Sequence, residues 1–252
     1  MAGVTERPVR PGWSFLLTRE AAGLLLIAGL AWLAVIAQAR GMSAMAATMG
    51  LGLLAFVGVW TLMMGAMMLP TVAPVAVLYE RSVTDNRLLR LAGFAASYIV
   101  VWGLAGLPAF AIAVFLSSLA MDHPQTTRYI AAGIFLILGL YQVSPLKDRC
   151  LRHCRSPLGL LIHYANYHGP LRDVQAGTHH AIYCLGCCWA LMLVLIVAGI
   201  MNLFVMVVLA AVILVEKYWS RGEAFSRVVA AAAVVLAVAA IFIPALSPGL
   251  SS

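Results

Sequence analysis

Six long apolar stretches decide what this chain can fold into. A helix needs about 20 mainly apolar residues to cross the hydrocarbon core of a bilayer. The stretches run roughly over residues 21–38, 47–69, 91–120, 129–146, 185–215 and 226–246. We therefore predict an all-α fold, a polytopic membrane helix bundle with about six transmembrane helices.

The overall composition agrees with a membrane domain and leaves little room for a soluble one. Of the 252 residues, 63% are hydrophobic and 10% are charged, whereas soluble domains carry about 25% charged residues. We expect residues 1–252 to form a single integral membrane domain. The first apolar stretch is too long for the core of a signal peptide, and no small-residue cleavage site follows Arg40, so we expect an uncleaved anchor.

The formal charge of +7 marks topology rather than a nucleic-acid surface, because the basic residues are spread over many segments. With the N-terminus in the cytoplasm, eleven of the 16 Lys and Arg residues lie on the inner side. The other five lie outside, namely Arg40, Arg128, Lys217, Arg221 and Arg227. The positive-inside rule then predicts both termini in the cytoplasm, N-in and C-in. Membrane lipid is the expected environment, and no nucleic-acid partner is expected.

The fifth apolar stretch opens with a row of soft metal ligands. His180, Cys184, Cys188 and Met192 are each four residues apart, a spacing that places side chains on one face of a helix. Cys187 adds a third thiol beside them. Thiolates and thioethers select Cu(I) above all, and imidazole suits both copper and zinc. The alternative is that these residues only pack, as membrane Cys and Met often do.

The second stretch ends with four methionines, Met63, Met64, Met67 and Met68, which form two pairs with i, i+4 spacing. Met64 and Met68 are one such pair, so their thioethers point in the same direction. They are candidates for an entry path or a weaker second site for a soft metal. Flexible packing explains such methionines equally well. Pro70 and Pro74 follow and are expected to kink or end this helix.

Residues 147–180 form the longest polar connection and are predicted to be a cytoplasmic segment, partly re-entrant or lying on the membrane surface. Cys150 and Cys154 are four residues apart in this segment, with His153 between them. Further histidines follow at positions 163, 168, 179 and 180, which makes a zinc site credible. Cytoplasmic thiols are kept reduced, so we expect metal binding rather than disulfides for the five cysteines.

Three polar residues interrupt the apolar pattern further on. Asn202 lies near the middle of the fifth stretch and is expected to form a hydrogen bond between helices. Glu216 and Lys217 follow that stretch and are expected to be interfacial anchors at its outer end.

These segments together resemble a bacterial family of predicted metal-binding integral membrane proteins. The resemblance rests on Trp60-x2-Met63-x2-Ala66-Met67-Met68-x-Pro70, Tyr141-Gln142-x2-Pro145-x-Lys147-x2-Cys150-x3-Cys154-Arg155-x-Pro157, Gly177-x2-His180-x3-Cys184-x-Gly186-Cys187-Cys188-Trp189, Gly199-x-Met201-Asn202 and Glu216-Lys217. One departure is Ala181, where the family usually has Gly. The resemblance implies metal binding, a multi-helix fold and the bacterial inner membrane.

The metal candidates are therefore His180, Cys184, Cys187, Cys188, Cys150, Cys154, Met64, Met68 and Met192. Copper is the first choice of metal and zinc the second. The leading hypothesis is a membrane protein that binds copper and transfers or inserts it, with a partner metalloprotein or a larger membrane complex. The alternatives are a copper- or zinc-dependent oxidoreductase or a subunit of one, and a structural subunit of a membrane complex.

Overall fold

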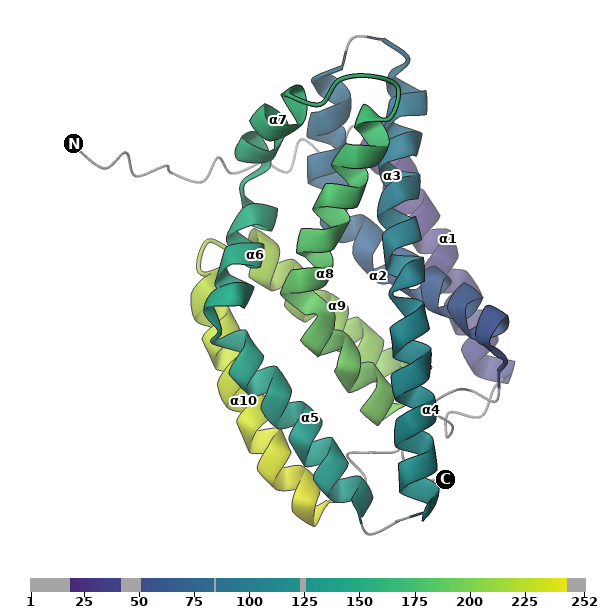
Figure 1. Ribbon diagram of the computed structural model, residues 1–252, viewed down its shortest axis with the longest axis vertical. Coiled ribbons are helices and arrows are strands. Elements are labelled where there is room, and N and C mark those ends of the chain that lie inside the picture. The colour runs from purple at the N-terminus through teal and green to yellow at the C-terminus, as the bar shows by residue number, and fades with distance from the viewer. Residues whose placement is uncertain (1–18, 42–50, 84, 123–125, 244–252) are drawn as a thin grey trace, which may run out of the picture.

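Helices account for almost all of the regular structure, as the apolar periodicity predicts. A computed structural model of the protein describes residues 19–41, 51–83, 85–122 and 126–243 (Figure 1). Its helices are α1 (Arg19–Gly41), α2 (Leu53–Arg81), α3 (Arg87–Leu104), α4 (Gly106–Asp122), α5 (Thr127–Gln142), α6 (Pro145–Arg155), α7 (Pro157–Ala165), α8 (Arg172–Ala198), α9 (Leu203–Tyr218) and α10 (Gly222–Phe242). The all-α prediction is confirmed.

Five helical segments are long and apolar enough to cross a membrane. They are α1, α2, α3 continued by α4, α8 and α10, and the pair of α5 and α6, bent by 62°, makes a sixth. The predicted multi-pass membrane bundle is thus confirmed. The predicted start at residue 47 and the predicted end at residue 246 lie outside the described residues.

Two boundaries differ from the sequence prediction. Helix α2 continues through Pro70 and Pro74 to Arg81, so these prolines do not end it. The apolar stretch 185–215 is not one span but two helices, α8 and α9. Gly199 between them has a positive φ of 89°, a conformation that suits glycine. Asn202 then caps α9, because its side chain accepts a hydrogen bond of 3.2 Å from the Val205 amide.

Helix α9 turns back along α8, so the residues at the C-terminal end of α9 lie beside the middle of α8. The Lys217 ammonium donates to the Cys184 thiol over 3.0 Å, although 32 residues separate Lys217 from the middle of α8 in sequence. Asn202 is therefore part of a turn rather than a bond between spans, and its Nδ2 donates to the Ala198 carbonyl. Glu216 and Lys217 are 2% and 5% exposed, so the prediction of interfacial anchors is wrong.

The core that positions the cysteines is centred on α3, which packs along both α2 and α8. The Trp60 indole donates to the Trp102 carbonyl over 3.0 Å, which ties α2 to α3. Phe94 and Tyr98 of α3 are fully buried against this core. At one end, the carboxylate of Asp173 on α8 accepts hydrogen bonds from Tyr79 of α2 and Arg90 of α3.

The return of α9 also changes the side of the membrane on which α10 is expected to end. Helix α10 runs antiparallel to α5, since Ser226 donates to Gln142 while Gly139 lies against Ala230 (Figure 1). The end of α10 therefore lies at the opposite end of the bundle from the beginning of α1.

Arg155 contacts the Trp219 and Ser220 carbonyls, so the 217–227 segment joins the inner side. Fourteen of the 16 basic residues, the original eleven plus Lys217, Arg221 and Arg227, then lie inside. With α9 as a crossing in addition to the six spans, the revised prediction is N-in and C-out, and the topology stays a prediction.

We expect a reporter fused after Ile243 to lie outside the cytoplasm. Alkaline phosphatase at this position should be active and green fluorescent protein dark, because the first folds only outside and the second only inside. A fusion after Asn86, between α2 and α3, is the matched control and should give the reverse pattern. Strong fluorescence at both positions would restore the C-in prediction.

Gly177→Ala should destabilise the contact between α3 and α8. A Cβ at Gly177 would overlap the Phe94 carbonyl oxygen and the Ser97 hydroxyl, so the helices must separate. Overpacking of this kind costs about 1–3 kcal/mol. Thermal unfolding in detergent should show a lower midpoint than for Gly58→Ala, whose Cβ meets nothing within 4 Å. Equal midpoints would show that α3 and α8 are not in close contact.

Candidate metal centre

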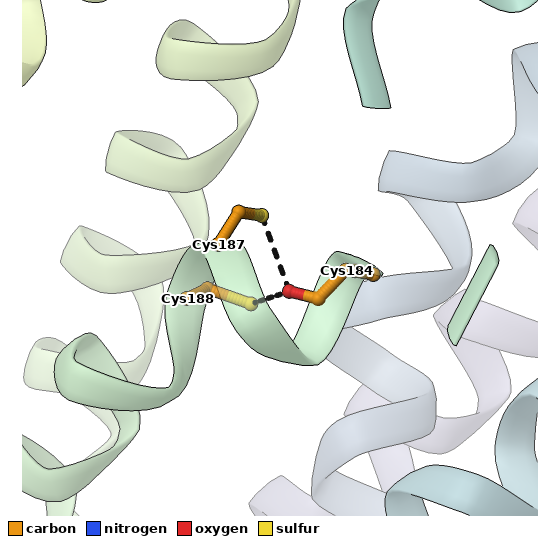
Figure 2. A group of neighbouring side chains, drawn as sticks. All are labelled: Cys184, Cys187 and Cys188. Carbon is orange, nitrogen blue, oxygen red and sulfur yellow. Dashed lines mark hydrogen bonds between the residues drawn. The ribbon is translucent and has the colours of Figure 1, made fainter. Parts of the chain in front are cut away.

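Three thiols of α8 form the centre of the site. The sulfur atoms of Cys184, Cys187 and Cys188 all lie within 4.8 Å of one another (Figure 2). The i+3 and i+4 spacing brings them to one side of the helix. Cys187 and Cys188 donate to the Cys184 carbonyl oxygen over 3.1 and 2.8 Å. All three residues are at most 2% exposed. The structure thus brings together the predicted thiol cluster, while its role in metal binding stays a prediction.

Helix α6 adds a fourth thiol from outside α8. The Cys154 thiol lies close enough to that of Cys187 to affect it electrostatically, although it is not among the sulfurs that lie within 4.8 Å of one another. Cys150, one turn earlier, packs on α8 at Gly186, where a Cβ would come within 2.8 Å of the Cys150 sulfur. Both cysteines are buried, and all five cysteines are free thiols. Cys150 and Cys154 therefore lie on a packed helix rather than in a loose loop, and Cys154 is the closer partner of the cluster.

A lysine and a tyrosine contact the Cys184 sulfur directly. The Lys217 ammonium of α9 lies 3.0 Å from this sulfur and 3.1 Å from the Thr71 hydroxyl of α2. The Tyr98 hydroxyl of α3 lies 2.9 Å from the same sulfur. Among the described residues, no carboxylate forms an ion pair with Lys217. A buried positive charge is costly unless it is compensated, and the Cys184 sulfur and the Thr71 hydroxyl accept the hydrogen bonds of this ammonium.

The residue before Lys217 is held by a separate buried network. The Glu216 carboxylate accepts from the Lys147 ammonium over 2.7 Å and from the Gln142 amide over 2.9 Å. Ser226 of α10 donates to Gln142. Lys147 and Glu216 are 0% and 2% exposed. This network ties α5, α6, α9 and α10 together, and it fixes the end of α9 beside the thiols.

His180 lies one turn before Cys184 on α8. Its ring sits beside the rings of Phe94 and Tyr98, with centroids 6.2 and 5.9 Å away. The side chain is 1% exposed, and its Nδ1 atom has no hydrogen-bond partner in the described structure. Such an imidazole has a free position for a ligand. His180 is not among the groups that lie within 4.8 Å of one another, so its place in the metal centre stays a prediction.

The predicted methionines are buried on two helices, α2 and α8. Met64 and Met68 are fully buried in α2, and the Met68 carbonyl accepts from Thr71, the residue that touches Lys217. Met192 lines an apolar hollow of about 400 Å³ together with Trp60 and Trp102. Their role as metal ligands also stays a prediction.

Sequence reasoning missed Tyr98, Thr71 and Lys217 as neighbours of the thiols. A signal was present for Lys217, because an ionisable residue beside a long apolar stretch in a membrane domain points to a functional position. It was assigned to the wrong end of the stretch, since the turn at Gly199 was not recognised.

Comparison with known proteins agrees with the chemistry of this centre. Residues 57–241 match the family model described as PpoB2, a copper chaperone. No curated protein and no solved structure shows significant similarity to the chain. The matched region contains every predicted metal ligand, and it refines the resemblance to predicted metal-binding membrane proteins. The chain belongs to the PpoB2 copper chaperone family, and it is a multi-pass membrane protein that handles copper.

Proposed function

We propose that this protein binds Cu(I) at Cys154, Cys184, Cys187 and Cys188 and delivers it to a copper-dependent partner protein, from a position in the bacterial inner membrane. The observation that carries the proposal is the convergence of three buried sulfurs within 4.8 Å. Thiolates are the ligands that Cu(I) prefers. A family of copper chaperones implies a protein that receives the metal. This family supports transfer over the oxidoreductase and the structural subunit.

The charge of Lys217 supports a thiolate site for a monovalent ion. Two thiolates and one Cu(I) carry a net charge of −1, and the Lys217 ammonium, 3.0 Å from the Cys184 sulfur, balances it. A charge buried in a membrane protein must be compensated in this way. The positive charge of Lys217 also favours deprotonation of Cys184 when a metal binds, and the thiolate is the form of cysteine that binds metals.

An excess of ligands supports transfer rather than permanent storage. Four thiols and His180 lie in or beside the centre, more than the two or three ligands that a linear or trigonal Cu(I) site needs. An incoming ligand can therefore replace one thiolate while the others still hold the metal. Met64 and Met68 on α2 and Met192 on α8 offer softer, weaker ligands for entry, and Cys150 is a further thiol beside Gly186.

Replacing Cys184, Cys187 and Cys188 together by Ser should remove tightly bound copper. Serine keeps the size and a hydroxyl donor, so packing should survive while affinity for a soft metal falls. Elemental analysis of protein purified from copper-replete cells should show the loss of about one copper per chain. Cys150→Ser is the matched control and should reduce copper content less than Cys184→Ser does. Full copper occupancy in a folded triple variant would show that the thiols only pack.

Lys217→Met should weaken Cu(I) binding by about tenfold or more, because it removes the buried positive charge that balances the thiolates. A tenfold change in affinity corresponds to only about 1.4 kcal/mol. Competition with a Cu(I) chelator measures this change. Lys217→Arg keeps the charge and should restore most of the affinity. If Met and Arg variants bind Cu(I) as the native chain does, the ammonium does not compensate the site.

A further inference from the structure

Three histidines from three different helices meet beside the thiol centre. His153 lies on α6, His163 on α7 and His179 on α8. The His179 ring centroid is 4.7 Å from that of His163 and 5.1 Å from that of His153. His179 is thus the middle member of a group that we call the histidine trio. The trio lies outside the thiol cluster, and the proposed function does not use it.

Two nitrogens of the trio lack the hydrogen-bond partners that buried imidazoles normally have. The Nε2 atom of His153 and the Nδ1 atom of His179 are buried without a hydrogen-bond partner in the described structure. Buried polar atoms are usually satisfied, and each exception calls for an explanation such as an ion. Two such atoms on neighbouring rings point to one shared ligand that accepts electron pairs.

Neighbouring tyrosines hold the three imidazole rings in place. Residues around a metal site commonly orient its histidine ligands in this way. His153 stacks on Tyr183 with centroids 3.7 Å apart, and His179 lies 5.0 Å from the same ring. The His163 Nε2 atom lies 3.1 Å from the Tyr167 hydroxyl, which leaves its Nδ1 atom for a ligand. A hydrogen bond from the second ring nitrogen is typical of histidines that bind metals.

From these contacts we propose that His153, His163 and His179 form a second copper site, through which copper passes between the cytoplasm and the thiols. Imidazole binds copper in both of its common oxidation states. The trio adjoins the centre in sequence, because His153 precedes Cys154 and His179 precedes His180. His163 is exposed while the other two are partly buried, so the site opens outward. The proposal rests on copper handling by this chain but not on which thiols bind.

Binding requires a small closure of the site. The three donor atoms are not among the groups within 4.8 Å of one another in the described structure. His163 is the exposed member, at the last turn of the short helix α7, so a movement of this residue toward His179 disturbs the buried core least. We expect copper to draw His163 inward and to fix α7 against α8.

The test uses the full-length chain in detergent with all five cysteines replaced by Ser, so that no thiol reduces or binds the Cu(II). Cu(II) alone is the probe, followed by electron paramagnetic resonance and by competition with a chelator. We expect about one Cu(II) per chain with hyperfine coupling to several nitrogens. His163→Ala and His179→Phe, which keeps the aromatic packing, should each weaken binding at least tenfold. His168→Ala is the control, since His168 is exposed and no contact joins it to the trio, and it should change nothing.

The possible results separate this proposal from the proposed function. Absence of nitrogen coupling, or equal binding by the His163, His179 and His168 variants, would overturn the histidine site. Thermal unfolding shows whether each variant is folded, and the exposed His163 provides a test that does not disturb the core. In a chain with native cysteines, His163→Ala should keep the tight Cu(I) stoichiometry but load from a Cu(I) donor more slowly. If His163→Ala abolished tight Cu(I) binding in that chain, the histidines would belong to the tight Cu(I) site and not to a transfer site beside it.

Discussion

Two consecutive charged residues at the end of α9 fix the arrangement of the site. Glu216 pairs with Lys147 of α6, and Lys217 pairs with the Cys184 sulfur of α8. Neither charge reaches solvent, and an isolated charge in an apolar bundle costs several kcal/mol. The end of α9 is therefore stable only between α6 and α8. Because α6 carries Cys154 and α8 carries the other three thiols, these two contacts hold both thiol-bearing helices against the end of α9.

The sequence predicts the elements of this fold better than their connections. Apolar length identifies the spans, and the spacing of Cys184 and Cys188 identifies one helix face, since both depend on local geometry alone. The α8–α9 hairpin was not predicted, because 31 nearly continuous apolar residues are typical of a single transmembrane helix. The local signals were present: Gly199 adopts a positive φ and Asn202 caps the next helix. Length outweighed them in the prediction, and the turn has the greater effect on the site.

Contacts between distant residues were beyond sequence reasoning for a physical reason. Lys217 and Cys184 become neighbours only after a chain reversal, and Tyr98 reaches the same sulfur from α3. No spacing rule relates residues on different helices. By contrast, Cys154 was predicted as a partner of the thiols, because a reduced cysteine near an apolar span has few other uses. Cys154 lies near Cys187, and its role as a ligand stays a proposal.

Burial of the thiols sets a condition on how copper is transferred. Cys184, Cys187 and Cys188 are at most 2% exposed, so a partner protein cannot touch these sulfurs in the described arrangement. Either the helices separate or the metal moves to a more accessible ligand. Separation of α8 from α9 would break the Lys217 contact and leave an ammonium unpaired in an apolar bundle, which is costly. A ligand at the edge of the bundle avoids this cost. Movement through histidines that are partly exposed therefore requires less reorganisation than opening the thiol centre.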